Sequence, residues 1–206
     1  MTAFCDWLVA HGSSCLELFG VVLGVITVYL STIENIWSWP TALLNAGAFS
    51  IVFFRTGLYS DAGLQVIYFI LSLYGWYEWL YGGENRTALH VSRTPRSLGV
   101  RLAVIGIACA AMLGTLLARF TDAALPYIDS ATTSTSLVAQ WMMTRKILEN
   151  WAVWVAVDVV YIAMFIFKRL YLTAGLYAVF LVLAVMGYVQ WKRSLAERSV
   201  ASHASS

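Results

Sequence analysis

Six long apolar runs constrain this chain more than any other feature of its sequence. A bilayer core of about 30 Å needs about 20 mostly apolar residues in a helix to cross it, and each run has roughly that length. Of the 206 residues, 60% are hydrophobic and only 12% are charged, against about 25% charged residues in a soluble domain. We therefore expect an all-α membrane protein. The runs cover residues 15–32, 37–54, 64–81, 99–117, 151–167 and 172–191.

An internal repeat predicts a seventh helix. Glu34-Asn35 and Trp39 match Glu149-Asn150 and Trp154 at an offset of 115, whereas residues 58–79 match residues 170–191 at an offset of 112. The first offset places the polar segment 129–148 over the first apolar run, which predicts that this segment is also a helix. Two three-helix units with one helix between them, a 3+1+3 arrangement, are parallel repeats related by an axis along the membrane normal.

The positions of the basic residues favour seven transmembrane helices over six. Lys and Arg accumulate in the cytoplasmic loops of membrane proteins. Seven spans place nine of the 13 basic residues on one side, whereas six spans divide them six to seven. The N-terminus is therefore predicted outside and the C-terminus inside. The expected domains are an N-terminal repeat (1–83), a cytoplasmic linker with its linker helix (84–125), a C-terminal repeat (126–193) and a disordered tail (194–206).

Several function classes lack the residues that they require. Thirteen basic and eleven acidic residues leave no dense basic patch for nucleic acid. The three cysteines and three histidines are isolated, so neither a metal site nor another cofactor is expected. No ATP-binding or HExxH motif is present. A membrane enzyme or a binding-only receptor remains a less favoured alternative, because no Ser, Cys or His is placed as a nucleophile beside Asp158.

Polar residues within the apolar helices are expensive and therefore mark candidate sites. On the helix around 64–81, polar and aromatic residues recur at helical spacing along one face. The matching face of the last helix carries Tyr177, and both faces end in a Gly and a Trp. Alternatively, the glycines are helix packing points and the tryptophans are interface anchors. The first face is Asp61, Gln65, Tyr68, Ser72, Gly75 and Trp79; the second is Thr173, Tyr177, Phe180, Ala184, Gly187 and Trp191.

Three further helices carry candidate contacts. The helix around 151–167 has Asn150, Trp151, Trp154 and Asp158 on one side. Asp158 belongs either to a solute site or to a structural hydrogen bond with the hydroxyls of the helix 129–148. Asn45 is a lone amide, for which a bond between helices and a ligand contact are equally good explanations. The helix 129–148 presents Thr133, Leu137, Gln140, Trp141 and Thr144 on one face, and its Ser and Thr hydroxyls can also bond to their own backbone.

Aromatic rings, amides and one acid suit a small, flat, polar solute. Tryptophan faces attract flat cationic rings, and amide side chains bind amide groups of a ligand. No Lys or Arg falls in the middle of a predicted span, so a phosphate group would lack a counter-charge there. These residues alone predict a transporter for a compact aromatic or glycosidic solute.

Four motifs stand out: residues 34–40 (ENIWSWP), 59–65 (YSDAGLQ), 75–79 (GWYEW) and 149–154 (ENWAVW). With these motifs the sequence resembles the PnuC family of bacterial nicotinamide riboside transporters over about residues 15–195. The resemblance implies seven helices in a 3+1+3 arrangement similar to SWEET proteins, and a multi-pass protein of the bacterial inner membrane. It also implies facilitated diffusion of nicotinamide riboside, which feeds NAD biosynthesis after a cytoplasmic kinase traps it, and a homo-oligomer such as a trimer.

The resemblance also implies which residues contact the solute. It assigns Asn150, Trp151 and Trp154 of the second repeat and Gln65 of the first. The helical faces add Gln140, Trp141, Thr144, Asn45, Asp158, Tyr68 and Tyr177. Thiamine and riboflavin remain alternative solutes, since relatives in this family carry other vitamins. The expected mechanism is alternating access, in which the two repeats rock around a fixed site.

Overall fold

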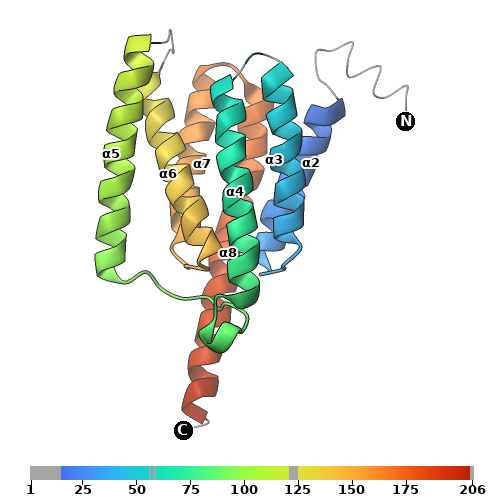
Figure 1. Ribbon diagram of the computed structural model, residues 1–206, viewed down its shortest axis with the longest axis vertical. Helices are drawn as coiled ribbons and strands as arrows, with labels where there is room; N and C mark the ends of the chain where they lie inside the picture. Colours follow the sequence, from blue (N-terminus) through green and yellow to red (C-terminus); the bar gives the residue numbers. More distant parts are fainter. Residues whose placement is uncertain (1–14, 56, 58, 121–124, 205–206) are drawn as a thin grey trace. The chain divides into compact units, whose positions relative to one another are not determined.

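The computed structural model describes residues 15–55, 57, 59–120 and 125–204, and within them the fold is all helical (Figure 1). The seven α-helices found there agree with the predicted number. The chain divides into two compact units, residues 1–88 and 89–206. The helices are α2 (Cys15–Thr32), α3 (Ser38–Arg55), α4 (Tyr59–Tyr81), α5 (Arg96–Phe120), α6 (Pro126–Thr144), α7 (Asn150–Phe167) and α8 (Tyr171–Ala204), with a short 3₁₀ turn, η1 (Glu84–Arg86).

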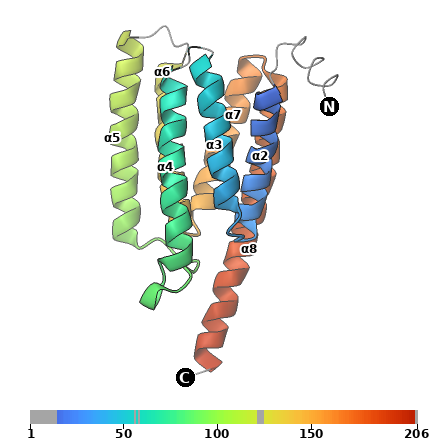
Figure 2. The same cartoon turned by 45° about the vertical axis from the view of Figure 1, so that its right-hand side comes forward.

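The N-terminal unit packs α2 against α3 and α3 against α4 (Figure 2). Two polar contacts join α2 to α3. Thr27 Oγ1 donates to Thr41 Oγ1 at 2.9 Å, and the Asn45 side chain donates to the carbonyl oxygen of Gly20. Gly20 allows this close approach, because a Cβ atom there would lie 2.7 Å from the Phe49 ring.

The C-terminal unit packs α5 on α6, α6 on α7 and α7 on α8. Its α8 is a single helix that runs well past the ends of α6 and α7 (Figures 1 and 2). The sequence predicts a disordered tail from residue 194, whereas α8 continues as a helix to Ala204. Beyond its apolar run, α8 continues through the charged residues Lys192, Glu197 and Arg198.

The polar segment between the fourth and fifth apolar runs is a helix, α6, as predicted. Some of its hydroxyls bond to their own backbone, which satisfies them without partners from other helices. Ser130 Oγ donates to Pro126 O at 2.7 Å, and Thr132 Oγ1 donates to Ile128 O at 2.9 Å. Both side chains are buried. The helix is therefore polar in sequence and yet buried within its unit.

Length and composition qualify three of the described helices as membrane spans. These are Arg96–Phe120, Asn150–Phe167 and residues 171–198 of α8, while the apolar segment Leu18–Thr32 is shorter. Polar residues within α4 and α6 lower their hydropathy, which is why those two fall outside this group. Large apolar side chains are exposed along every described α-helix, as expected for helices that face lipid.

The turns and tryptophan pairs of α2–α4 and α6–α8 correspond at an offset of 112, so the predicted offset of 115 for the first half is wrong. Each first helix ends in a left-handed residue, Glu34 (φ 53°) or Lys146 (φ 47°). The next backbone N–H bonds to the carbonyl oxygen five residues back in both turns: Asn35 N to Leu30 O at 2.9 Å, and Ile147 N to Met142 O at 3.1 Å. This is a Schellman helix end. Gly57 and Arg169 repeat the positive φ at the next turn.

Candidate functional site

Each unit contains a pair of perpendicular tryptophan rings over a glycine. In the N-terminal unit, Trp39 and Trp79 lie 5.2 Å apart at 89°, and Trp39 covers Gly75 so closely that a Cβ atom would overlap its ring. In the C-terminal unit, Trp151 and Trp191 lie 5.4 Å apart at 88°.

In the C-terminal unit, Trp151 covers Gly187 in the same way as Trp39 covers Gly75. The glycines are therefore helix packing points. The alternative that Trp79 and Trp191 are interface anchors is wrong, because they are 3% and 0% exposed.

The starts of α3 and α7 carry polar atoms without partners. Ser38 and Trp39 begin α3, and Asn150 and Trp151 begin α7 at the matching positions. All four side chains are at most 3% exposed. Ser38 Oγ, Trp39 Nε1, Asn150 Oδ1 and Trp151 Nε1 have no hydrogen-bond partner among the residues that the structure describes. Buried polar atoms are rarely left unpaired, so both helix starts are candidate ligand contacts.

The orientation of the Asn150 amide is fixed by its own turn. Its Nδ2 donates to Ile147 O at 2.6 Å, which leaves Oδ1 as the unpaired atom. The O and N of an amide side chain are assigned from such networks. The indole N–H of Trp151, the next residue, is a donor only. Asn150 and Trp151 therefore offer one acceptor and one donor.

Asp158 lies two turns further along α7, on the side that Trp151 and Trp154 share. It is 3% exposed, and no hydrogen bond or ion pair to it is found within the described part of the chain. The predicted structural bond to α6 hydroxyls is absent from these residues, where Ser134 Oγ and Ser136 Oγ are buried without partners. A buried carboxylate of this kind requires a proton or a positive partner.

The turn before α7 is held by the segment that precedes α5. Ser92 N donates to Lys146 O at 3.0 Å, and Leu148 N donates to Ser92 O at 2.9 Å. Glu149 Oε2 accepts from both Thr94 N and Thr94 Oγ1, each at 2.8 Å. We call residues 91–94 with these bonds the strap. The strap fixes the residue immediately before Asn150, and the sequence analysis identified neither Glu149 nor Thr94 as a functional residue.

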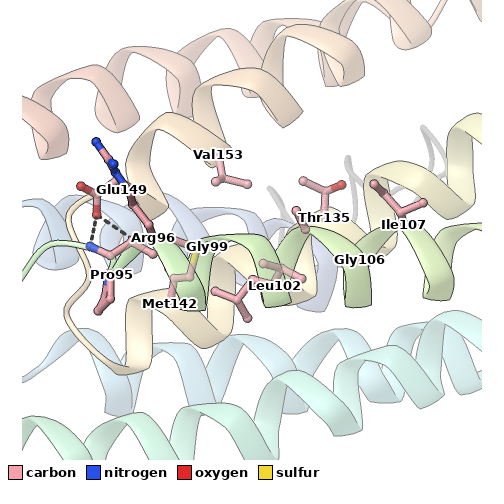
Figure 3. Close-up of a pocket in the computed structure, with 13 residues that line it drawn as sticks. Pro95, Arg96, Gly99, Leu102, Gly106, Ile107, Thr135, Met142, Glu149 and Val153 are labelled. Carbon is pink, nitrogen blue, oxygen red and sulfur yellow. Dashed lines mark hydrogen bonds between the residues drawn. The ribbon is translucent and has the colours of Figure 1, made fainter.

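A cavity of about 480 Å³ lies among α5, α6 and α7. Figure 3 shows Arg96 and Glu149 at one end and apolar side chains such as Leu102, Met142 and Val153 along the rest. None of the predicted contact residues lines it. Because its lining is mainly apolar and Glu149 is already bonded to Thr94, a polar solute would find few groups to bind there. We therefore place the candidate site of the C-terminal unit at the start of α7 and not in this cavity.

The remaining candidates of the C-terminal unit differ in how they are bonded. Thr144 is fully buried and donates to Trp141 O at 2.7 Å, so its hydroxyl is satisfied within α6. Gln140, Trp141 and Trp154 are half-buried. Tyr177 packs in an aromatic group, with its ring 4.7 Å from Tyr161 and 5.2 Å from Phe165.

The candidates of the N-terminal unit lie on two helices. Asn45 on α3 bonds to Gly20 O, which supports the explanation that it joins two helices. Gln65 and Tyr68 on α4 are half-buried, and Asp61 at the start of their face is exposed. Ser72 is buried and donates to Tyr68 O at 2.8 Å. The face is thus polar and accessible at its beginning and packed at its end.

Sequence reasoning found the α7 residues and missed Ser38 and Trp39, because the wrong offset paired Trp39 with Trp154. The signal that could have found them is the Gly75–Gly187 match, which extends to Trp39 and Trp151 at 112. Among the residues described, no group of His, Cys, Asp and Glu side chains is arranged to hold a metal ion.

Comparison with known proteins gives consistent results. The profile of a family described as nicotinamide mononucleotide transporter matches residues 14–193. The nicotinamide riboside transporter PnuC of Escherichia coli (strain K12) is 29% identical over 90% of this chain and 88% of that protein. The riboflavin/roseoflavin transporter RibM of Streptomyces davaonensis is 26% identical over 85% and 83%.

A solved structure has a similar fold. The crystal structure of the vitamin B3 transporter PnuC superposes with a TM-score of 0.72 and 20% identity, and the match covers 93% of this chain and 86% of that one. At this identity the match concerns the fold, and it agrees with the helical architecture described above.

Proposed function

The chain belongs to the nicotinamide mononucleotide transporter family, and from this premise we propose that it carries nicotinamide riboside across a membrane. The family is one of transporters and not of enzymes. Relatives named for nicotinamide riboside support the choice of solute.

The unpaired polar atoms of α7 carry the proposal. Asn150 Oδ1 and Trp151 Nε1 are buried without partners and offer an acceptor and a donor, which is the complement of a primary carboxamide. Asp158 is buried on the same side of the helix and would balance the positive charge of a pyridinium ring. Nicotinamide riboside has both groups. Gln65, Gln140, Trp141, Thr144, Trp154, Tyr68, Tyr177 and Asn45 remain candidate contacts in this proposal.

The charge distribution favours the riboside over the mononucleotide. A phosphate group would need Lys or Arg near the site, and α2, α4, α6 and α7 contain neither residue. Lys146 lies at the turn before α7 and is itself buried, with its carbonyl bonded to the strap. The riboside needs no such counter-charge.

Riboflavin is the second candidate, because a relative is named for riboflavin and roseoflavin. Its ring has amide-type groups that an acceptor and a donor could also bind. It is neutral at pH 7, however, so it would leave the carboxylate of Asp158 without a positive partner. Thiamine has a cationic ring that Asp158 could balance, but it lacks the carboxamide that Asn150 and Trp151 would bind.

Calorimetric titration of the purified protein with nicotinamide riboside, nicotinamide mononucleotide, riboflavin and thiamine tests the proposal. We expect binding of the riboside alone. Asp158→Asn should weaken riboside binding by more than about tenfold. The interaction free energy of a buried charge pair exceeds the roughly 1.4 kcal/mol that corresponds to a tenfold change in affinity. The control is Asp129→Asn, which removes a half-buried carboxylate 3.7 Å from Lys168 Nζ. Riboflavin binding that is insensitive to Asp158→Asn would replace the riboside by riboflavin.

We also propose the finer features that the sequence predicts. These are the 3+1+3 arrangement with the N-terminus outside, a location in the bacterial inner membrane, and a homotrimer. Transport would be facilitated diffusion by alternating access, which supplies a precursor for NAD synthesis. A disulfide or chemical crosslink between the two repeats on one membrane face should abolish uptake into vesicles and leave binding intact. Uptake that survives the crosslink would contradict the rocking mechanism.

A further inference from the structure

The cavity among α5, α6 and α7 is not explained by the solute site. Its lining is mainly apolar and includes none of the predicted contact residues, and all of it belongs to the C-terminal unit. The helix α5 packs on α6, and α6 packs on α7. In the part of the chain that the structure describes, no comparable packing joins α5 to α7. The cavity is therefore a space that α5 and α7 leave open beside α6.

This cavity is an open groove and not an enclosed chamber. Ala103 and Ile107 of α5 line it, and both are exposed. Gly99 and Gly106 also line it, and the absence of their side chains hollows this face of α5. An occupant can therefore reach the groove from the side of α5. Because α5 qualifies as a membrane span, that side meets lipid.

The length of the groove matches one leaflet of a bilayer. Figure 3 shows Arg96 at one end and Ile107 toward the other. Residue 107 lies eleven positions after residue 96, which is about 16 Å along a helix. Half of a hydrocarbon core is about 15 Å. A single acyl chain that runs along α5 would therefore extend over the groove, with its headgroup near Arg96.

The end of the groove at Arg96 suits a phosphate group. Arg96 is exposed and takes part in no ion pair within the described residues, and the exposed Arg93 is close in sequence. Among the residues found to line the groove, Glu149 is the one acid, and its Oε2 already accepts two bonds from Thr94. Arginine binds phosphate through parallel hydrogen bonds. The helix α5 also begins at Arg96, and the first N–H groups of a helix favour an anion.

We propose that this groove binds an anionic phospholipid, with one acyl chain along α5 and the phosphate at Arg96. The lipid fills the space between α5 and α7 and contacts the strap, because Thr94 lines the same groove. The C-terminal unit should therefore be more stable with the lipid than without it. The groove is separate from the solute site, so the proposal does not depend on the identity of the solute.

Thermal unfolding of the purified, delipidated protein in a non-ionic detergent tests the headgroup. Phosphatidylglycerol should raise the melting temperature by about 3 °C or more, because a ligand that binds only the folded protein stabilises it. Phosphatidylcholine with the same acyl chains has no net charge and should give a smaller shift. Glycerol 3-phosphate, which has a phosphate group but no acyl chain, should give none.

The variant Arg96→Gln tests the position of the phosphate. It removes the positive charge at the end of the groove, so the shift with phosphatidylglycerol should fall to the shift with phosphatidylcholine. The matched control is Arg119→Gln, which removes an exposed arginine in the last turn of the same helix. This control should keep the full shift.

The variant Gly106→Leu tests the position of the acyl chain. An added Cβ at Gly106 meets only Val138, at 3.6 Å, so the larger side chain fits and extends into the groove. Leucine also favours a helix over glycine, and the lipid-free variant should therefore be at least as stable as the wild type. Its shift with phosphatidylglycerol should be lost. The matched control is Gly175→Leu in α8, where the new Cβ has open space, and it should keep the shift.

Four results would overturn the proposal. The first is a wild type that shows no shift with any lipid, or equal shifts with phosphatidylglycerol and phosphatidylcholine. The second is a full shift in Arg96→Gln, and the third is a shift that survives Gly106→Leu. The fourth is a smaller oligomer of Gly106→Leu than of the wild type and Gly175→Leu by light scattering, which would assign the groove to an interface between copies of this chain. None of these results bears on the binding of nicotinamide riboside.

Discussion

The turn between α2 and α3 and the turn between α6 and α7 have the same backbone but different supports. Both end the first helix with a left-handed residue and a Schellman bond. The second turn is then tied to the strap by two backbone bonds and by Glu149. At the position of Glu149 the first turn has Trp37, which is 65% exposed. The two turns therefore share a backbone geometry but place different side chains at the position that contacts the strap.

Different contacts accompany the starts of the two helices. The strap holds the residue before Asn150, so Asn150 and Trp151 directly follow a braced turn. In the first turn, Asn35 Oδ1 accepts from Trp37 N at 2.9 Å, a contact that lies within the turn itself.

The largest effect should come from what the two repeats share. Gly75→Ala and Gly187→Ala place a Cβ atom into the rings of Trp39 and Trp151, and such overpacking should cost about 3 kcal/mol of unfolding free energy. Thermal unfolding in detergent measures it. The matched controls are Gly63→Ala and Gly175→Ala, which are also 112 apart and have open space around the new Cβ. These should be neutral or stabilise by up to about 1 kcal/mol, since Ala favours helix over Gly.

A difference between the two tight positions would be informative as well. A loss of unfolding free energy in Gly187→Ala without a loss in Gly75→Ala would mean that only the C-terminal Trp pair is rigidly packed. Equal stability of the tight variants and their controls would contradict the close packing of both Trp rings.

Features of the fold that depend on neighbouring residues in the sequence could be predicted, and features that depend on distant residues could not. The helices, including the polar α6, follow from apolar runs and the repeat, and the Gly–Trp match was visible at 112. The correct offset of the first half was not visible in the sequence. Glu34-Asn35 and Glu149-Asn150 are identical dipeptides, but they do not occupy matching positions in the two turns. The correct match is carried by the φ angles of Glu34 and Lys146, two residue types that do not indicate a left-handed conformation as glycine would.

The strap and the unpaired atoms needed the structure for another reason. Thr94 and Glu149 are 55 residues apart, and no local pattern pairs a threonine with a glutamate at that distance. Asp158 and Asn150 could be proposed from the cost of polar groups in a membrane. Whether such a group already has a protein partner depends on its neighbours in space, which is why Asn45 and Thr144 are bonded and Asn150 Oδ1 is not.

The next largest effect should come from removing the contact between Glu149 and the strap. Glu149→Ala removes the acceptor of two bonds from Thr94 and should cost about 2 kcal/mol, because hydrogen bonds to a charged group contribute about 1.5–3 kcal/mol. Hydrogen exchange should show faster exchange of the Ser92 and Leu148 amides. Thr94→Val should give part of this effect. The control is Glu84→Gln, an exposed acid of η1, and protection that is unchanged in Glu149→Ala would contradict the brace.

A smaller effect should come from the polar contact that only the first repeat has. Asn45→Val installs the residue of the matching position, Val157, and removes the bond to Gly20 O. We expect a loss of about 1 kcal/mol, the net value of one neutral hydrogen bond. The reverse change, Val157→Asn, should cost more, because it buries an amide at a position that is 3% exposed. A loss of solute affinity in Asn45→Val beyond the loss of stability would identify Asn45 as a ligand contact.

The smallest effect should come from Trp37, the exposed counterpart of Glu149. Trp37→Ala leaves the backbone bond to Asn35 in place and should change the unfolding free energy by less than about 0.5 kcal/mol, as exposed substitutions generally do. Asn35→Ala, which removes the acceptor of that bond, should cost more, about 1 kcal/mol. Thermal unfolding of the two variants beside Glu149→Ala measures the contrast directly. A loss in Trp37→Ala as large as that in Glu149→Ala would mean that the first turn is also braced, through its tryptophan, and the two turns would then differ in the chemistry of their support and not in its presence.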